Sequence, residues 1–326
     1  MSVLDRILVT GGVGFLGSHI SERLVESGLT IRILDNSWRG AKRNLEKVID
    51  KVEFVEGDVR DYNTVNKVMK GMDTVFHLAS IQGTKHFYEV PDATLEVGLI
   101  GALNVAKAAI KNKIERILFP SSSEVYGTPQ FFPTAEDHPL IIPDAKNPRW
   151  SYSIEKIASE SVFLNYAKKF GFDATIVRIH NAYGPRMGWE HVIPEFIRRL
   201  ELKELFTVQG NGSETRSFCY VSDIVDGIIL AAGKEEGKNE IFNLGNPKEE
   251  YSINSLIKLM GKFSGKNITP IYLERREGST KRRRPDISKA EKMIGFKPKI
   301  NLERGFKLTY DSVSYTHLTL PTTPYV

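Results

Sequence analysis

The chain has 326 residues, of which 41% are hydrophobic and 26% charged. This length suffices for one large α/β domain with a smaller second lobe. No apolar run approaches the roughly 18–20 residues of a membrane-spanning helix, and Leu4–Val9 leads directly into a glycine turn, without a signal-peptide cleavage region. The single Cys219 excludes an intramolecular disulfide. We therefore expect a cytoplasmic protein, with no membrane partner and with Cys219 as a buried structural thiol.

The formal net charge is +5, and much of the excess lies in one basic stretch near the end of the chain. This stretch is either a solvated loop or a group of side chains that hold a diphosphate. No nucleic-acid-binding module accompanies it, and the histidines show no metal-ligand spacing, so we expect neither nucleic acid nor metal as a partner. The stretch consists of Arg275, Arg276, Lys281, Arg282, Arg283 and Arg284.

Short apolar segments alternate with amphipathic ones through the first half of the chain, which predicts a Rossmann-type, doubly wound parallel sheet of the α/β class. One helix has Ile20 and Leu24 on a single stripe and ends at Gly28, and two others cover about Ala93–Lys111 and Ser153–Phe170. The expected strands are Arg6–Val9, Thr30–Leu34, Val52–Val55, Thr74–Leu78, Arg116–Phe119 and Ala174–Ile179.

The regular alternation loosens after Asn181, where we expect a helix at Ile193–Leu202, a strand at Phe206–Gln209 and a helix at Asp223–Ala232. Ile241–Leu244 is predicted as a seventh strand of the main sheet. The expected NAD-binding domain comprises residues 1–180 and about 218–244. A smaller C-terminal α/β substrate lobe comprises about 181–217 and 245–312. Residues 313–326 lack helical periodicity and resemble a translated sequencing-adapter end, so we expect a non-native tail.

A glycine-rich loop, Thr10–Gly17, follows the first strand and opens the first helix. Gly11 suits the tight turn, Gly14 the close approach of a pyrophosphate to the backbone, and Gly17 the packing of helix on strand. Asp35 ends the next strand, where a carboxylate accepts the adenosine ribose hydroxyls and repels a 2′-phosphate. The pattern favours NAD over NADP, although the nearby Arg39, Lys42 and Arg43 are able to accommodate a phosphate.

Tyr152 and Lys156 lie four residues apart, on one face of a predicted helix. An ammonium near a phenol lowers the phenol pKa, so we expect tyrosinate to serve as a general base near neutral pH. Ser122 follows a predicted strand and supplies a hydroxyl that is able to share the substrate proton. An isolated Tyr–Lys pair is commonly a surface pair, but its occurrence with Ser122 after a nucleotide loop is rare by chance.

To about Tyr310 the chain resembles the extended short-chain dehydrogenase/reductase family of nucleotide-sugar epimerases, dehydratases and decarboxylases. The resemblance implies the doubly wound fold, NAD as cofactor, a nucleoside-diphosphate sugar as substrate and a homodimer. The motifs that carry it are TGGVGFLG, LDN at Leu34–Asn36, GDV at Gly57–Val59, HLAS at His77–Ser80, SSSEVYG at Ser121–Gly127, YSIEK at Tyr152–Lys156, NAYGPR at Asn181–Arg186, TRSFCYVSD at Thr215–Asp223 and RRRPDISKA at Arg282–Ala290.

Position by position, the resemblance implies a catalytic triad of Ser122, Tyr152 and Lys156. Substrate contacts follow at Ser122, at Asn181 on the pyrophosphate, at Val192 and Val208–Gly212 around the base, and at Arg216 and Arg276 as a phosphate clamp. The implied cofactor-binding residues are Gly11, Gly14, Phe15, Leu16, Gly17, Asp35, Asn36, Asp58, Val59, Leu78, Ala79, Ser80, Tyr152 and Lys156.

Three positions bear on which reaction of the family the chain performs. Family decarboxylases and several dehydratases carry a glutamate where this chain has Glu124, which is either a second catalytic acid or base on the sugar or a carboxylate bonded to loop backbone. Ser123 replaces the aspartate usual in 4,6-dehydratases, which argues against dehydration. Gly98 replaces an asparagine usual before the Gly101–Asn104 stretch.

The reaction that we favour from the sequence is NAD-dependent epimerisation of a nucleoside-diphosphate sugar, at C4, through a transient 4-keto intermediate. The rivals among enzymes are decarboxylation of a UDP-glucuronate-type sugar and 4,6-dehydration. Outside enzymes the rival is an NAD-binding scaffold or sensor, which the intact Ser122, Tyr152 and Lys156 disfavour.

Overall fold

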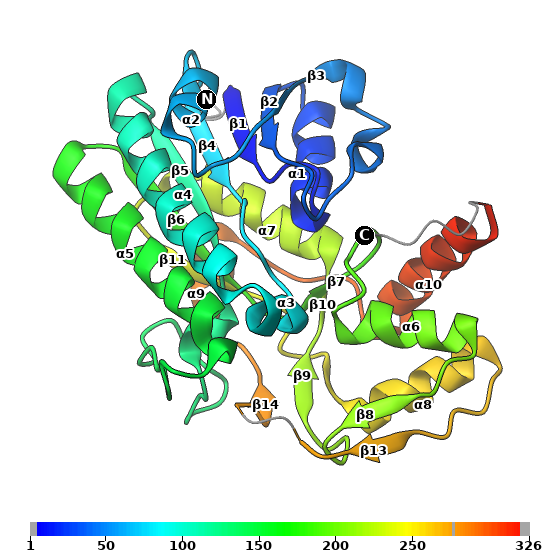
Figure 1. Cartoon of the computed structure of the whole chain (residues 1–326). Helices are drawn as coiled ribbons and strands as arrows, with labels where there is room; N and C mark the ends of the chain where they lie inside the picture. Colours follow the sequence, from blue (N-terminus) through cyan, green and yellow to red (C-terminus); the bar gives the residue numbers. More distant parts are fainter. Residues whose placement is uncertain (1–4, 276–277, 320–326) are drawn as a thin grey trace.

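The computed structural model describes residues 5–275 and 278–319, and its centre is a seven-stranded parallel sheet (Figure 1). The strands follow one another across the sheet in the order β3-β2-β1-β4-β5-β6-β11. Strands buried on both faces are expected to be continuously apolar, as β1 is from Ile7 to Val9. The bounds are β1 Arg6–Thr10, β2 Thr30–Asp35, β3 Val52–Glu56, β4 Thr74–His77, β5 Arg116–Ser122, β6 Asp173–Ile179 and β11 Ile241–Leu244.

The strand order reverses between β1 and β4, which are neighbours in the sheet and run parallel to each other. Thr10 at the end of β1 pairs with His77 at the end of β4. In open parallel sheets, ligands bind beyond the carboxyl ends of the strands at such a reversal. The fold therefore places the glycine loop after β1 and the Leu78–Ser80 segment after β4 at the same edge of the sheet.

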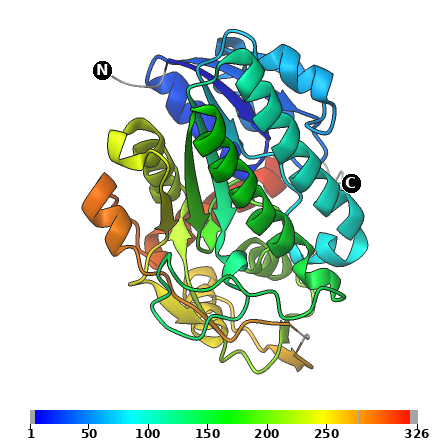
Figure 2. The same ribbon diagram turned by 90° about the vertical axis from the view of Figure 1, so that its left-hand side faces the viewer.

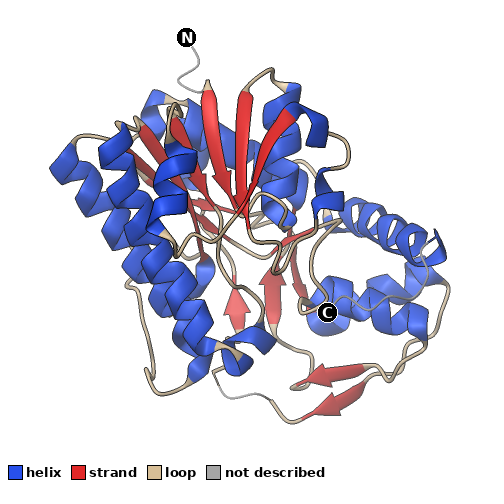
Figure 3. Cartoon of the chain, turned by 45° about the horizontal axis from the view of Figure 1, so that its top comes forward, coloured by secondary structure: helices blue, strands red, loops and turns tan. Residues whose placement is uncertain are grey.

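Helices cover both faces of the sheet (Figures 1 and 3). On one face, α2 (Tyr62–Met69), α4 (Pro91–Asn112) and α5 (Ser151–Phe170) pack side by side, and their apolar residues form one core with Leu8, Val75 and Ile117. On the other face, α1 (Phe15–Glu26) packs against α7 (Val221–Gly233) over a second core. This second core continues into the substrate lobe, so the lobe and the sheet share buried side chains.

Among the described residues, one helix qualifies as a membrane span by length and composition alone, against the expectation from the sequence. It is α4, with 22 residues and a mean hydropathy of 1.4 over its most apolar stretch. Half of that stretch is buried inside the structure, where α4 packs between α2 and α5. A core helix covering a sheet is apolar for the same reason as a spanning helix, because most of its surface is removed from water.

The substrate lobe lies beyond the carboxyl ends of the strands (Figures 1 and 2). Its sheet β12-β9-β14 brings together three segments that are far apart in the chain, and β13 pairs with β8. The other helices and strands described outside the central sheet and the helices that cover it are β7, β10, α3, α6, α8, α9 and α10. The bounds are α3 Thr84–Glu89, β7 Ala182–Tyr183, α6 Val192–Leu202, β8 Thr207–Gln209, β9 Thr215–Ser217, β10 Cys219–Tyr220, β12 Glu250–Ser252, α8 Ile253–Ser264, β13 Ile271–Leu273, β14 Arg282–Arg283, α9 Ser288–Ile294 and α10 Leu302–Thr319.

The predicted fold class is confirmed, including Ile241–Leu244 as the seventh strand. The division into two domains stays a prediction. Residues 313–319, which lack helical periodicity in the sequence, continue α10, and the non-native origin expected for residues 313–326 stays a prediction. Leu302 and Phe306 anchor the first turns of α10 in the core, and an established helix propagates through residues of modest propensity. Residues 320–326 lie outside the described part.

Candidate active site

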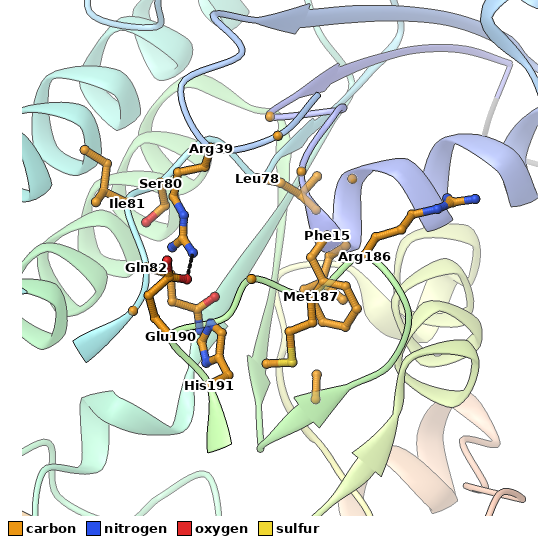
Figure 4. A pocket seen from close by; sticks show the side chains of 18 of the residues that line it. Phe15, Arg39, Leu78, Ser80, Ile81, Gln82, Arg186, Met187, Glu190 and His191 are labelled. Atoms are coloured by element: carbon orange, nitrogen blue, oxygen red, sulfur yellow. Dashed lines mark hydrogen bonds and ion pairs between the residues drawn. The ribbon is translucent and has the colours of Figure 1, made fainter. Parts of the chain in front are cut away.

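A cleft of about 1670 Å³ opens at the carboxyl edge of the sheet and extends between the sheet and the substrate lobe (Figure 4). Every predicted cofactor-binding and catalytic residue lines this cleft, as do the predicted substrate contacts Asn181, Val192 and Arg216, whereas Arg276 lies outside the described residues. The Val208–Gly212 stretch, expected around the nucleotide base, does not line the cleft. Val208 is instead buried in the core of the lobe, where β8 pairs with β13.

The glycine loop leaves no space for side chains on its inner side. Gly11 has a positive φ of 72°, and its amide donates to the Leu34 carbonyl at 2.9 Å. A Cβ on Gly17 would lie 2.1 Å from the Gly11 carbonyl oxygen, so helix α1 approaches the turn as only glycine permits. Gly14 caps α1 without a side-chain hydrogen bond. The first amides of α1 therefore form a cradle suited to a pyrophosphate, which fits NAD.

Asp35 lies at the end of β2, with its carboxylate turned towards the glycine loop. It accepts hydrogen bonds from the amides of Val13 at 3.0 Å and Ser37 at 2.7 Å. Burial raises its pKa, and the backbone donors counteract part of that rise. Two of the three cations that the sequence offered for a 2′-phosphate of NADP are engaged by carboxylates, Arg39 by Glu190 and Lys42 by Glu56.

Farther along the adenine side, Asp58 pairs with Arg60 at 2.9 Å and accepts from the Asn36 side-chain amide at 3.1 Å. These contacts fix Asp58 and Asn36 in the wall of the cleft where the resemblance placed adenosine contacts. The structure thus brings the two residues together, and their role toward the cofactor stays a prediction.

Tyr152 and Lys156 are both buried on the first turns of α5, facing the cleft. The Tyr152 ring stacks on Phe87, with 5.1 Å between centroids. The Lys156 ammonium donates to the Pro120 carbonyl at 3.2 Å and lies 4.5 Å from the centre of the Phe119 ring. Ser122 ends β5 and its hydroxyl hydrogen-bonds the Tyr152 side chain. The predicted Ser, Tyr and Lys are therefore brought together.

The expected effect of Lys156 on Tyr152 is not what the structure gives. Burial raises the pKa of the Tyr152 phenol far above its usual range, and the carboxylates of Glu155 and Glu124 add to the rise. The hydrogen bond from Ser122 and the charge of Arg39 lower it only in part. The prediction of a phenol pKa near neutrality is therefore wrong for the protein alone. The main physical reason is burial of the phenol, followed by Glu155, whose carboxylate lies 3.7 Å from the Lys156 ammonium.

The sequence suggested that Glu124 is either a second catalytic acid or base or a carboxylate bonded to loop backbone. Neither description fully covers its observed contacts. Its carboxylate is held by two guanidiniums, that of Arg149 at 2.7 Å and that of Arg283 through both of its terminal nitrogens. Burial opposes ionisation, but these two cations hold the pKa of Glu124 far below its usual range. Glu124 is therefore an ionised carboxylate within a charged cluster, and only its own amide, bonded to Ser122 at 3.2 Å, belongs to the loop backbone.

Arg216 adjoins this cluster because β9 and β14 pair with Arg216 opposite Arg283. The Arg216 guanidinium donates to the carbonyls of Thr215 and Thr280, both at 2.8 Å or less. Burial, followed by the charge of Arg283, lowers the pKa of Arg216 to about 9. Such a crowded set of cations favours an anionic ligand.

Asn181 lines the same corner of the cleft, in the left-handed conformation at a φ of 40°. Its side-chain amide donates to the Ser217 carbonyl at 3.3 Å. Val192, the other predicted substrate contact, begins α6 and lines the cleft from the lobe.

Two ion pairs join the cofactor side of the cleft to the segment after β7. Arg39, from the loop after β2, meets Glu190 at 2.9 Å (Figure 4). Arg186 pairs with Glu22 of α1 at 2.6 Å, next to a hydrogen bond between the His19 ring and the Pro185 carbonyl at 3.1 Å. The segment over residues 185–190 is therefore tied to the cofactor side at both of its ends.

Sequence reasoning missed Arg149, Arg283 and Glu190 as individual site residues. Arg149 lies just before the Tyr152 motif and Arg283 lies within the basic stretch, so position alone singled out neither. Of that stretch, Arg282 and Arg284 pair with Glu250, and Arg275 pairs with Glu214. Of the described members of the stretch, only Arg283 lines the cleft, and a role in holding a diphosphate stays a prediction.

Two negative findings concern other chemistry. Within residues 5–275 and 278–319, no three His, Cys, Asp or Glu side chains are grouped so as to hold a metal ion. Cys219 is a free, fully buried thiol in the core shared by sheet and lobe, and burial raises its pKa well above the usual value. The prediction of a buried structural thiol is confirmed.

Comparison with known proteins places this site in a family. The model of the NAD-dependent epimerase/dehydratase family matches residues 7–245. The chain is 36% identical over 315 residues to a UDP-N-acetyl-alpha-D-glucosaminuronate decarboxylase of Bacillus cytotoxicus, covering 93% of this chain and 96% of the relative. It is 35% identical over 306 residues to a putative UDP-glucose 4-epimerase of Methanocaldococcus jannaschii, covering 92% and 96%.

The solved structures agree. The UDP-glucose 4-epimerase of Thermotoga maritima, crystallised with UDP-glucose, superposes with a TM-score of 0.87 at 31% identity, over 96% of this chain and 99% of that one. The family match spans most of the chain and includes the glycine loop, Ser122, Tyr152 and Lys156. This chain belongs to the NAD-dependent epimerase/dehydratase family and is an enzyme of nucleotide-sugar metabolism.

Proposed function

We propose that the enzyme oxidises C4 of a nucleoside-diphosphate uronate, of the UDP-glucuronate type, and releases its carboxyl group as carbon dioxide. The observation that carries the proposal is the cluster of Glu124 with Arg149 and Arg283, beside Ser122. With Arg216, three guanidiniums surround one carboxylate, which leaves two positive charges unmatched among these four side chains. Guanidinium forks bind phosphate and carboxylate, the two anionic groups of such a substrate.

Decarboxylation ranks ahead of the epimerisation favoured from the sequence because a neutral hexose brings no anion to this corner beyond its diphosphate. The curated relative from Bacillus cytotoxicus, named as a decarboxylase of a uronate, supports this choice. The Methanocaldococcus relative, named as an epimerase, keeps C4 epimerisation as the second candidate. Both reactions use the same first step at C4.

The glycine loop and Asp35 would hold NAD, which supplies the hydride acceptor when bound. The Ser122 and Tyr152 side chains, which both line the cleft, would hold the sugar O4, and Tyr152 in its phenolate form accepts the O4 proton as C4 is oxidised. Lys156, one turn along α5, is placed beside the Tyr152 ring at 5.5 Å from its centre. The positive charges of Lys156 and Arg39 oppose the rise in the Tyr152 pKa as the phenolate forms.

The oxidised sugar is a β-keto acid, with its carboxyl group two bonds from the C4 carbonyl. The C5–C6 bond breaks, its electron pair moves towards the keto oxygen, and carbon dioxide leaves. Hydrogen bonds from Ser122 and Tyr152 stabilise the resulting enolate oxygen. Arg149 and Arg283 orient the carboxylate before the bond breaks. A proton from water then adds to C5, the hydride removed in the first step returns to C4, and Tyr152 returns the proton to O4.

Dehydration receives less support. Loss of a C6 hydroxyl requires a proton donor at the leaving oxygen, and Ser123 offers no acid there. Glu124 is ionised by its two guanidinium partners, and an ionised carboxylate donates no proton.

The test is a panel of UDP-glucuronate, UDP-N-acetylglucosaminuronate, UDP-glucose and dTDP-glucose, with products followed by proton NMR and carbon dioxide measured directly. We expect carbon dioxide and a UDP-pentose from a uronate. A C4 epimer formed without carbon dioxide would replace the proposal with epimerisation, and a 6-deoxy-4-keto product would replace it with dehydration. NAD binding with no conversion of any sugar would favour a scaffold or sensor.

A further inference from the structure

Glu155 is a buried carboxylate that the proposed reaction does not use. It precedes Lys156 on α5, and its side chain is 0% exposed. One carboxylate oxygen accepts a hydrogen bond from the Ser80 hydroxyl at 2.9 Å and lies 3.7 Å from the Lys156 ammonium. The other oxygen has no hydrogen-bond partner among the described residues. Buried carboxylates are rare unless paired, so this placement requires a reason.

The chain makes room for Glu155 by omitting a side chain on the neighbouring helix. A Cβ on Gly98 of α4 would lie 2.4 Å from the unpartnered Glu155 oxygen and 2.5 Å from its carboxyl carbon. The resemblance led us to expect asparagine at this position. Gly98 and Glu155 are therefore complementary, and the carboxylate occupies the volume that a side chain at position 98 would take.

The Ser80 bond connects Glu155 to the cleft. Ser80 lies in the segment after β4 and lines the cleft beside the glycine loop. Its hydroxyl donates to Glu155 from one side while Lys156 approaches the same oxygen from the other. The carboxylate thus joins the cofactor wall to the helix that bears Tyr152.

Several charged or titratable groups surround Glu155 and the two side chains that it acts on, Tyr152 and Lys156. On α5 itself these are Tyr152, Lys156 and Glu160, on β4 His77, in the turn after β5 Glu124, and in the loop after β2 Arg39. Within residues 5–275 and 278–319, Lys156 is the one cation in ion-pair distance of Glu155. The positive charge of Lys156 therefore interacts with both the Tyr152 phenol and the Glu155 carboxylate.

We propose that Glu155 is a positioning residue for proton transfer at Tyr152, holding the Lys156 ammonium and tying it through Ser80 to the wall of the cofactor cleft. This inference rests on the proposed roles of Tyr152 and Lys156. Burial raises the pKa of Glu155 and lowers that of Lys156, and the attraction between the two groups stabilises the charged form of each. The Glu155 carboxylate also opposes formation of the neighbouring phenolate. Proton transfer at Tyr152 consequently occurs at higher pH than it would beside Lys156 alone.

The test is Glu155→Gln, which keeps the shape and removes the charge, with the exposed Glu115→Gln as matched control. Without the carboxylate, both Tyr152 and Lys156 lose their protons at lower pH. We therefore expect both limbs of the kcat/KM profile to move to lower pH by about one unit in Glu155→Gln. Glu115→Gln should leave the profile in place.

A second readout needs no substrate. The ultraviolet absorption of phenolate is titrated in the NAD-bound enzyme, and the same titration of Tyr152→Phe is subtracted, which isolates Tyr152. Glu155→Gln should shift this difference titration to lower pH by a similar amount. If no sugar is converted, the titration still decides the matter, so failure of the proposed function remains distinguishable. A profile or titration that only loses amplitude, without moving, overturns the proposal and makes Glu155 a packing residue.

Discussion

The two walls of the cleft are built in different ways. The cofactor wall is built around main chain, in which Gly11, Gly14 and Gly17 bring a turn and a helix end together. The substrate wall is side chain, in which Glu124 meets Arg149 and Arg283. The first needs only eight consecutive residues in one conformation. The second needs segments 25 and 159 residues apart to arrive with matched charges.

This difference separates what each wall contributes. A cradle of main-chain amides selects for a diphosphate but does not discriminate between the sugars attached to it. Burying a cluster of charges costs free energy. The charged side chains in the cluster determine which anion binds there, either in place of an existing ion pair or beside it. We therefore expect cofactor identity to depend on backbone geometry and sugar identity on the charged cluster.

Tyr152 lies between the two walls, and its substitution should have the largest effect on turnover. Tyr152→Phe keeps the ring stacked on Phe87 and removes the group that transfers the proton. We expect turnover to fall about 10²–10⁴-fold with NAD binding retained, measured by product NMR and by calorimetry. Tyr166→Phe, on the same helix but outside the cleft lining, is the control and should keep full activity. Equal losses in both variants would place the effect in the fold of α5.

Glu124→Gln should disrupt the charged cluster of the substrate wall. It leaves Arg149 and Arg283 without their carboxylate, and we expect a loss of about 3–5 kcal/mol in the free energy of unfolding near neutral pH, from urea titrations. The folded-state pKa of Glu124 is lowered, so its contribution is fully present above the unfolded value of about 4.3 and declines as pH falls below it. The difference between the two proteins should therefore shrink in acid.

Glu250→Gln is the matched control for this substitution. Glu250 also pairs with arginine, but the side chain of its partner Arg282 is 42% exposed. Water replaces the lost ion pair there, so we expect a cost of about 1 kcal/mol or less. Equal costs at the two sites would show that burial of the Glu124 cluster has no special energetic weight.

Gly17→Ala should break the main-chain wall. Its methyl group would lie 2.1 Å from the Gly11 carbonyl oxygen and 2.8 Å from the Gly12 Cα, and both belong to backbone. We expect a loss of about 1–3 kcal/mol in stability together with weaker NAD binding. Gly14→Ala sharpens the comparison, because its Cβ would meet one atom, at 3.2 Å. That variant should fold normally and lose only affinity for NAD, and a normal affinity would contradict close approach of the pyrophosphate at Gly14.

The smallest effect is expected where the two walls touch. Arg39→Gln removes the half-buried pair with Glu190 (Figure 4). Release of NAD, followed by stopped-flow fluorescence, should accelerate by no more than about fivefold. Glu190→Gln should act equally, and the double variant should add nothing, since both remove one interaction. Additive effects would mean that each side chain acts separately.

Sequence patterns predicted the cofactor wall and the sheet well because both depend on local regularities. The strand at Ile241–Leu244 and the turn at Thr10–Gly17 can each be predicted from a few consecutive residues. The charged wall was not predictable in the same way. Nothing near Arg149 or Arg283 in the chain indicates that both reach Glu124, since that meeting depends on how β14 pairs with β9.

The error on the Tyr152 pKa has the same origin. The spacing of Tyr152 and Lys156 predicts their shared helix face correctly, but burial and the neighbouring Glu155 dominate the phenol. The signal for Glu155 was present in Gly98, whose departure from the expected asparagine stands opposite the carboxylate. A pair of unusual residues on adjacent helices was informative only once their contact was known.

The place of β11 in the sheet bears on how such an enzyme is assembled and recombined. The strand that closes the β6 edge comes from residues 241–244, after the chain has already passed through α6, β8 and β9. The buried Arg116 guanidinium likewise donates to the carbonyls of Ala232 and Lys234, at the far end of α7. A fragment ending near residue 180 would expose β6 as an open edge prone to association. Nascent chains therefore complete the nucleotide half only after much of the lobe is synthesised, and chimeras that exchange substrate lobes need two junctions rather than one.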